Sequence, residues 1–239
     1  MGAVAGILFD KDGTLLDYHS TWMPANYAVA MELAGGDTVL RDALLAAGGW
    51  SRDSERVASG TALAAGDLQD IAELWLPMLP DAGHDRDSLV RFMDKAFPAN
   101  MVPTAVCALP DLLGRLGDMG YALGVATADS VYGLNESLKP FNILDRFVFA
   151  AGFDSGHGRK PGPGMVLGFC QAAGIEPQDV LVVGDNRHDV EMAAAAGAFA
   201  VGVLTGTSDR DELMASGAVA VLPSIAELPD YLTLANAGN

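Results

Sequence analysis

Short apolar runs alternate with amphipathic stretches along the second half of this 239-residue chain. Four runs consist almost entirely of apolar residues and glycine, which is typical of strands buried on both faces: residues 121–126, 180–183, 199–203 and 219–222. Helical patterns lie between and beside them: residues 130–139, 163–173, 188–196 and 209–216. Strands that alternate with helices predict a parallel sheet covered on both faces, and residues 4–9 supply its first strand.

The region after the first strand follows a different pattern. Its apolar positions recur at helical spacing, and it has no β-branched run like those of the predicted strands. We expect a purely helical module here, followed by a helix over residues 105–119 that returns the chain to the sheet. The predicted fold is a Rossmann-like α/β core with one helical insertion: residues 1–17 and 99–239 for the core, and residues 18–98 for the insertion.

The composition excludes several classes of partner. Hydrophobic residues make up 50% of the chain, enough for a sizeable core, and the formal net charge is −17. No run of Lys or Arg interrupts this acidity, so binding to nucleic acid or to an anionic membrane is disfavoured. An anionic substrate would need a local positive site made by a metal ion, a Lys or helix N-termini. The sequence gives no indication of the oligomeric state.

The sequence also favours a cytoplasmic location. Cys107 and Cys170 both lie in apolar surroundings and are interpreted as core thiols, because a disulfide framework needs more cysteines in a smaller chain. The beginning of the chain lacks the charged and apolar regions of a secretory signal, and no apolar run reaches the length of a membrane span. We therefore expect a soluble cytoplasmic protein.

Two aspartates follow the first predicted strand, in the segment GILFDKDGTLLD. Asp10 and Asp12 emerge at the carboxyl end of that strand, the edge where open parallel sheets bind ligands. Residues two apart in extended backbone point the same way, so both carboxylates can face one pocket. Such a pair repels unless a cation neutralises it or one carboxylate keeps a proton. Gly13 permits a tight turn beside them, and an Asp-Gly turn with solvated acids is the simpler alternative.

Three further segments reach the same predicted edge. Thr127 directly follows one strand, Lys160 lies in a loop before a helix, and Asp185 and Asp189 follow another strand. Each residue has an ordinary explanation by itself: a helix cap for Thr127, a solvated loop position for Lys160, and a favourable charge at a helix N-terminus for Asp189. Together they indicate phosphoryl transfer, because carboxylates bind Mg²⁺ while a hydroxyl and a Lys bind phosphate oxygens.

These positions resemble the haloacid-dehalogenase-like hydrolase superfamily, in the order that its four motifs require. The matching positions are Asp10 to Leu15 for the first motif, Thr127 for the second, Lys160-Pro161 for the third, and Gly184-Asp185 with Asp189 for the fourth. The helical insertion resembles the cap of the branch that contains phosphoglycolate phosphatases and β-phosphoglucomutases. The resemblance implies a magnesium-dependent phosphatase acting on a small phosphorylated metabolite that is phosphoglycolate-like.

The resemblance also implies a role for each matching residue. Asp10 would attack phosphorus and form an aspartyl-phosphate, and Asp12 would act as the acid and base. Mg²⁺ would be held by Asp10, Asp185, Asp12 through its backbone carbonyl, and Asp189 directly or in support. The phosphoryl group would be bound by Asp10, Asp12, Gly13, Thr127, Ala128 and Lys160.

Two departures from the superfamily pattern bear on substrate preference or loop geometry. Ala128 follows the hydroxyl residue where many relatives have Asn, and Asn186 stands where Thr is common. A phosphosugar mutase uses the same core residues and stays open as an alternative. A catalytically inactive binding module would be marked by loss of Asp10 or Asp12, and both are present.

The part of the substrate beyond the phosphate would be recognised by the insertion. Candidate residues for this recognition are His19, Trp22, Arg52 and Arg56. An Arg that faces the site would suit a carboxylate-bearing substrate such as phosphoglycolate, whereas a solvated helix Arg is the ordinary alternative.

Overall fold

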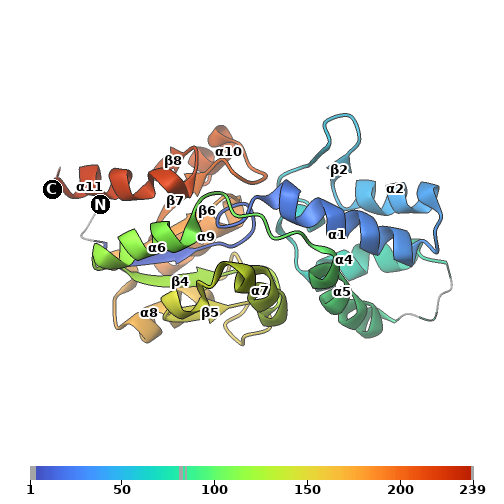
Figure 1. Cartoon of the computed structure of the whole chain (residues 1–239), viewed down its shortest axis with the longest axis horizontal. Helices are drawn as coiled ribbons and strands as arrows, with labels where there is room; N and C mark the ends of the chain where they lie inside the picture. The colour runs from blue at the N-terminus through green and yellow to red at the C-terminus, as the bar shows by residue number, and fades with distance from the viewer. Residues whose placement is uncertain (1–3, 81–82, 84, 238–239) are drawn as a thin grey trace.

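The computed structural model describes residues 4–80, 83 and 85–237 and consists of an α/β core beside a helical cap (Figure 1). The core ends expected at residues 1 and 239 lie outside the described residues. Within the described part of the chain, none of the helices has the length and apolar character needed to cross a membrane.

A six-stranded parallel sheet forms the centre of the core. Its order is β5 (Phe149–Ala151), β4 (Ala122–Ala126), β1 (Gly6–Phe9), β6 (Val180–Gly184), β7 (Phe199–Val203) and β8 (Ala220–Leu222). Phe9 at the end of β1 is level with Val125 and Val183 on the two neighbouring strands, so the loops after these strands begin side by side. The parallel sheet and its five expected strands are confirmed. The edge strand β5 was not expected, because a run of three residues carries no readable periodicity.

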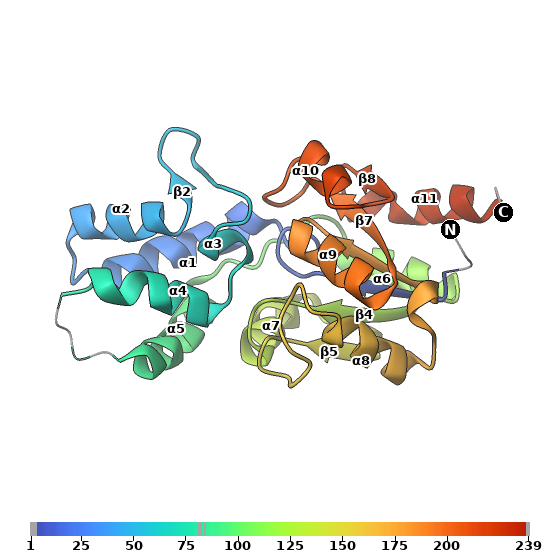
Figure 2. The same cartoon turned by 180° about the vertical axis from the view of Figure 1, so that it is seen from behind.

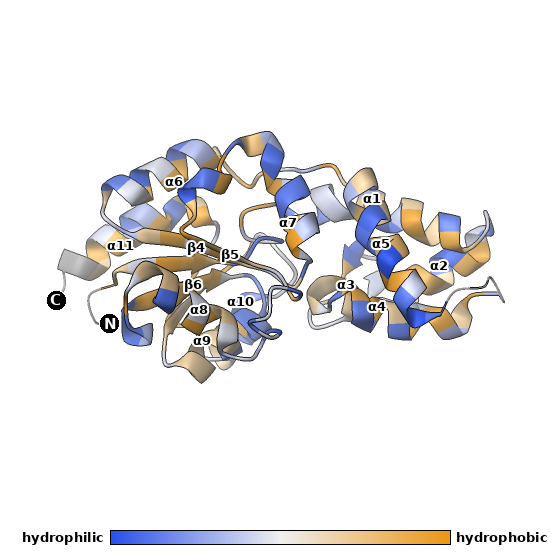
Figure 3. Ribbon diagram, turned by 90° about the horizontal axis from the view of Figure 1, so that it is seen from below, coloured by the Kyte–Doolittle hydropathy of each residue, from blue (hydrophilic) through white to orange (hydrophobic). Residues whose placement is uncertain are grey.

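Side chains of β1 alternate between the two faces of the sheet, as extended backbone requires. Ile7 and Phe9 belong to one buried cluster, and Leu8 belongs to another. The first cluster is covered by α6 (Leu109–Asp118), α7 (Val131–Leu138) and α11 (Leu228–Ala237). The second is covered by α8 (Gly164–Ala173), α9 (Arg187–Ala196) and α10 (Arg210–Ala215). Figure 3 shows α6 and α11 on one side of the sheet, with α8 and α9 on the other.

The cap has its own hydrophobic core, around the fully buried Trp75. Its helices are α1 (Tyr18–Leu33), α2 (Thr38–Ala47), α3 (Ala62–Ala65), α4 (Leu68–Trp75) and α5 (Arg86–Asn100). The expectation of a purely helical insertion is wrong at one place, where β2 (Trp50–Ser51) pairs with β3 (Arg56–Val57). Strands of two residues are too short to leave an alternating pattern in the sequence. Figure 2 shows α3 on the side of the cap that faces the core.

Two paired segments connect the cap to the core. Leu16 forms an antiparallel bridge with Ala105, and the Asp17 amide donates to the Thr104 carbonyl at 2.8 Å. The helix expected over residues 105–119 therefore begins only at Leu109, after this extended pairing, with Pro110 in its first turn. Because both connections leave the core at one point, the cap lies directly over the loops that follow β1, β4 and β6.

Candidate active site

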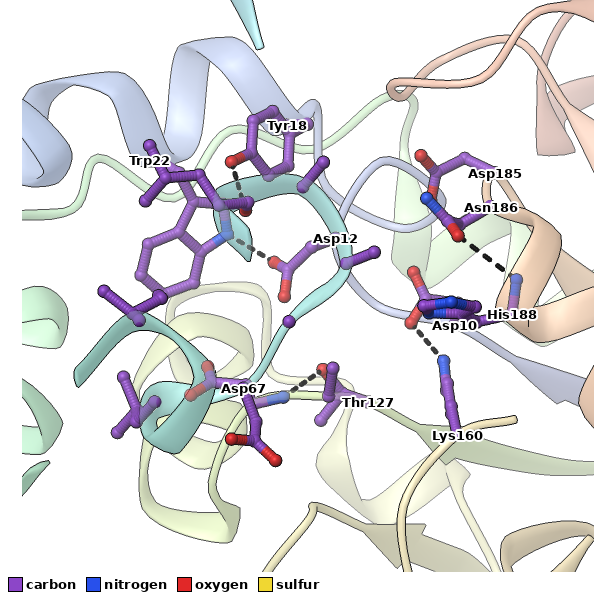
Figure 4. A pocket seen from close by; sticks show the side chains of 18 of the residues that line it. Asp10, Asp12, Tyr18, Trp22, Asp67, Thr127, Lys160, Asp185, Asn186 and His188 are labelled. Carbon is purple, nitrogen blue, oxygen red and sulfur yellow. Dashed lines mark hydrogen bonds and ion pairs between the residues drawn. The ribbon is translucent and has the colours of Figure 1, made fainter. Parts of the chain in front are cut away.

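Residues of the core and of the cap enclose a cavity of about 100 Å³ at the carboxyl ends of the central strands. Core residues that line it include Asp10 and Asp12 after β1, Thr127 after β4, and Asp185 after β6. The cap contributes the opposite wall. The predicted edge of the sheet is thus the edge at which the chemistry-bearing side chains meet (Figure 4).

Three buried carboxylates form a compact cluster in this cavity. One oxygen from each of Asp10, Asp185 and Asp189 lies within 4.8 Å of the others. The Lys160 ammonium lies 2.6 Å from an oxygen of Asp10 and 2.6 Å from an oxygen of Asp189. Because the Lys160 side chain is only 5% exposed, it is not the solvated loop residue that the sequence also allowed.

The cluster carries more negative charge than Lys160 alone can neutralise. Burial raises the pKa of Asp10 to about 7; the neighbouring carboxylates Asp189 and Asp12 add to this rise, and Lys160 opposes it. Burial, followed by Asp10 and Asp189, also raises the pKa of Asp185 well above its usual value. Burial works against the charge of Lys160, but Asp10 and Asp189 more than offset it and raise the pKa of that ammonium. Three hard oxygen donors with unbalanced negative charge suit a divalent cation.

Loops from neighbouring strands hold the cluster in place. The Thr207 amide donates to Asp185 at 2.8 Å, and the Thr205 hydroxyl donates to the Gly13 carbonyl at 2.7 Å. Gly13 does not line the cavity; its backbone, at φ +82°, packs against the Asp185 carboxylate. Sequence reasoning missed Thr205 and Thr207, since no motif marks the loop after β7.

Asp189 has two functions in this arrangement. It accepts from the Asn186 amide at 3.2 Å, and Asn186 in turn caps α9 by accepting from the His188 amide at 3.1 Å. Asp189 therefore does place a negative charge at the N-terminus of α9. The other oxygen of its carboxylate accepts from the Lys160 ammonium. Asn186, noted as a departure in the fourth motif, helps to fix the position of this carboxylate.

Asp12 points away from the carboxylate cluster and toward the cap. Its carboxylate accepts from the Trp22 indole nitrogen at 2.5 Å, and the Lys11 ammonium lies 2.7 Å from its second oxygen. Lys11 is completely buried and also contacts Asp129 at 3.1 Å. Sequence reasoning missed Lys11 and Asp129, whose contact joins residues 118 positions apart.

Thr127 and Ala128 line the cavity beside these acids. The Thr127 hydroxyl accepts from the Asp129 amide at 3.1 Å. The residue that caps α7 is instead Ser130, which accepts from the Gly133 amide at 3.0 Å. Thr127 is therefore not a helix cap, which was its ordinary explanation.

The structure brings Trp22 to the cavity, but not the other three candidates for substrate recognition. Arg52 pairs with Asp42 on the surface of the cap, and its side chain is 72% exposed. Arg56 donates to the Gly206 carbonyl of the core at 3.2 Å. Neither guanidinium lines the cavity.

His19 lies beneath the cap hairpin. Its Nε2 accepts from the Val57 amide at 3.2 Å, which requires the neutral ring. Burial lowers the pKa of His19, and the nearby Arg56 lowers it further. His19 therefore supports the hairpin and does not itself line the cavity.

Comparison with known families agrees with this geometry. The family model of the haloacid dehalogenase-like hydrolases matches residues 4–197. This range includes the aspartates, Thr127 and Lys160 of the site described above. The chain belongs to the haloacid dehalogenase-like hydrolases. The helical cap and parallel core are accordingly those of a hydrolase of this family.

Full-length relatives of this hydrolase are found among curated bacterial proteins. It is 27% identical to the phosphoglycolate phosphatase of Escherichia coli strain K12, over 99% of this chain and 95% of that protein. It is 28% identical to the phosphoglycolate phosphatase of Pseudomonas putida strain KT2440, over 96% and 83% of the two chains.

Solved structures share the fold of this hydrolase. A haloacid dehalogenase-like family hydrolase from Streptococcus pneumoniae superposes with a TM-score of 0.68 at 18% identity, covering 97% of this chain and 99% of that one. CbbY from Rhodobacter sphaeroides, solved in complex with phosphate, also gives a TM-score of 0.68, at 21% identity and with 94% and 96% coverage.

Proposed function

We propose that this hydrolase is a magnesium-dependent phosphatase that transfers the phosphoryl group of a small phosphate monoester to Asp10 and then to water. The observation that carries the proposal is the buried cluster of Asp10, Asp185 and Asp189, with Lys160 between two of its carboxylates. The curated relatives named above are phosphoglycolate phosphatases, so phosphoglycolate is the first reference substrate.

The three clustered carboxylates would hold Mg²⁺. When bound, the ion supplies positive charge that stabilises the phosphoryl oxygens as negative charge builds on them. The backbone carbonyl of Asp12 stays a predicted fourth protein ligand. Asp189, which is bonded to both Lys160 and the Asn186 amide, would keep the site from rearranging.

Asp10 and Asp12 would divide the chemistry between them. In the first step an Asp10 oxygen bonds to phosphorus while the bond to the leaving oxygen breaks, and that oxygen takes a proton from Asp12. In the second step Asp12 takes a proton from water, the water oxygen bonds to phosphorus, and Asp10 leaves as the free carboxylate. The Trp22 and Lys11 contacts support this role, because they orient Asp12 at the cap side of Asp10.

Thr127 and Lys160 would bind the phosphoryl oxygens. Both line the cavity, and the Lys160 ammonium already contacts Asp10, so it can stabilise charge on a group attached to Asp10. Ala128, which lines the cavity, and Gly13, which does not, stay predicted phosphate contacts from the family pattern.

Activity with a panel of phosphate monoesters tests the proposal. Phosphoglycolate, sugar phosphates, nucleotides and an aryl phosphate would each be assayed with Mg²⁺ and with EDTA. We expect phosphate release that needs Mg²⁺ and is abolished in Asp10→Asn. Asp118→Asn, at the exposed end of α6, is the matched control and should keep wild-type activity. A phosphosugar mutase would instead interconvert sugar phosphate isomers with little release.

Metal binding can be measured without turnover. Mg²⁺ should raise the melting temperature of the wild type, because a ligand that binds only the folded state stabilises it. This shift should disappear in Asp185→Asn and persist in Asp118→Asn. A folded protein that shows neither phosphate release nor a Mg²⁺-dependent rise in melting temperature would favour the alternative of a catalytically inactive binding module.

A further inference from the structure

The two walls of the active-site cavity differ in chemical character. The core wall carries the carboxylates and Lys160, whereas most of the cap wall is apolar. Its cap residues are Tyr18, Trp22, Asn26, Leu63, Ala64, Ala65, Gly66, Asp67, Leu68, Ile71 and Phe97. A phosphoryl group bound at the carboxylate cluster would point its leaving group toward this cap wall.

The cap wall offers no cation to a leaving group, among the residues that the structure describes. The cap sequence contains six basic residues: Arg41, Arg52, Arg56, Arg86, Arg91 and Lys95. None of them lines the cavity, and among the described cap residues Asp67 is the one carboxylate that does so. The charge that the cap presents to the leaving group is therefore negative.

Most hydrogen-bond donors on the cap wall are already engaged within the protein. The Trp22 indole donates to Asp12, and the Tyr18 hydroxyl donates to the Leu63 carbonyl at 2.5 Å. The backbone amides of residues 63–66 donate to carbonyls of residues 48, 61 and 62. The Asn26 amide donates to the Met23 sulfur, a weak acceptor, at 3.7 Å, and it also interacts with the Tyr18 hydroxyl; it can turn from these partners to a substrate hydroxyl.

Arg159, in the core, lines a neighbouring cavity that cap residues also line. Its guanidinium is occupied by cap groups: Nε lies 2.6 Å from Asp67, one NH₂ group donates to Gln69 at 2.6 Å, and the other lies 3.6 Å from Asp70. A substrate carboxylate would have to displace these partners.

We infer that the leaving group of the preferred substrate is an uncharged alcohol with a short apolar body, a substrate class that rests on the phosphatase function proposed above. A carboxylate on the cap wall would lose its water and gain no cation there, and it would lie near the acidic side chain of Asp67. An alkyl group would instead contact Leu68, Ile71 and Phe97, which are buried apolar residues. The Asn26 amide would accept or donate to one hydroxyl.

A size-matched series of two-carbon phosphate esters tests this inference. The probes are phosphoglycolate with a carboxylate, 2-hydroxyethyl phosphate with no charge, and phosphoethanolamine with an ammonium. We expect kcat/KM for 2-hydroxyethyl phosphate to exceed that for phosphoglycolate by about 100-fold. Ethyl and n-propyl phosphate should follow, and the added CH₂ of the propyl ester should raise kcat/KM by about fourfold.

A cation placed on the cap wall should reverse the preference. Ile71→Lys is the direct variant, and Ala64→Lys repeats the test at a half-buried cavity residue if the first does not fold. Either should narrow the ratio of 2-hydroxyethyl phosphate to phosphoglycolate at least tenfold. Val39→Lys adds the same charge at a 77% exposed position of α2 and should leave the ratio unchanged.

The outcomes separate the inference from the proposed function. Release from phosphoglycolate that equals or exceeds release from the uncharged ester would overturn the inference and leave the phosphatase intact. Phosphoethanolamine as the best of the series would also overturn it, with Asp67 as the recognising group. No release from any ester in the presence of Mg²⁺ would count against the phosphatase itself.

Discussion

The ammonium group of Lys11 has no contact with solvent and lies between two carboxylates, Asp12 and Asp129. It also lies 4.8 Å from the centre of the Trp22 ring, which adds a cation–π attraction. A buried cation of this kind is neutralised from several sides, so its removal leaves uncompensated charges behind.

We expect Lys11→Met to lower the free energy of unfolding by about 3 kcal/mol, because Asp12 and Asp129 lose their shared partner. Urea denaturation in the presence of Mg²⁺ measures the change. Lys139→Met removes the same charge from a side chain that is 73% exposed and 3.6 Å from Glu136, and should cost less than about 0.5 kcal/mol. Equal losses in the two variants would show that the Lys11 contacts contribute no more than a surface pair.

Single residues were predictable from the sequence only where a motif surrounds them. Asp10 could be found because the apolar run before it and the glycine after it predict a strand and a turn. Lys11 is its direct neighbour, yet its partner Asp129 follows a different strand, and no local pattern connects them. Arg52 and Arg56 were chosen by residue type and by their place in the middle of the cap, and neither lines the cavity.

At the scale of secondary-structure elements, the close approach of two loops sets the geometry of the carboxylate cluster. The turn after β1 passes so near to the loop after β6 that a Cβ atom on Gly13 would lie 2.5 Å from the Asp185 carboxyl carbon. Gly13 also has φ +82°, a conformation that residues with side chains rarely adopt.

Gly13→Ala should therefore displace Asp185 and reduce kcat/KM by about 100-fold, since small shifts of aligned groups are costly in catalysis. Gly35→Ala is the control, because Gly35 has φ +59° in a cap turn and no neighbour within 4 Å of an added Cβ. Backbone strain should lower the stability of both variants by about 1 kcal/mol, and Gly13→Ala should lose more because its Cβ also meets Asp185. Steady-state kinetics and thermal unfolding of both variants measure these effects. Equal losses of activity in the two variants would disprove the steric explanation.

Elements were predictable in proportion to their length. The runs that became β4, β6 and β7 are long enough to distinguish a buried strand from a turn. β5 and the hairpin of β2 and β3 are too short for that, and only pairing with a neighbour makes them strands. The start of α6 was displaced because residues before Leu109 pair with the segment that leaves β1.

Several polar contacts tie the cap to the core across the cavity. They join Arg159 to Asp67, Ser130 to Asp94, Ser59 to Ser208 and Arg56 to the Gly206 carbonyl. Arg159 directly precedes Lys160, so neighbouring residues contact the cap and the catalytic carboxylates. Cap closure and the position of Lys160 are thus coupled through one loop.

Arg159→Gln should weaken closure and raise KM about fivefold, with a smaller effect on kcat. Rising salt should move the KM of the wild type toward that of the variant, because the Arg159 side chain is 42% exposed and its pair is screened. Arg115→Gln removes an exposed pair with Asp230 in the core, away from these contacts, and should leave KM unchanged. A KM that is insensitive to Arg159 would mean that the other contacts hold the cap by themselves.

The order of strands in the sheet also sets the order in which a growing chain can assemble its active site. β1 is synthesised first, but both of its partners, β4 and β6, come after the whole cap. The cap is one continuous segment, so all of its helices have been synthesised before β4 appears, whereas the loop with Asp10 must wait for residues beyond 180. During that interval an apolar strand has no partner, and the completed cap beside it is the nearest folded surface.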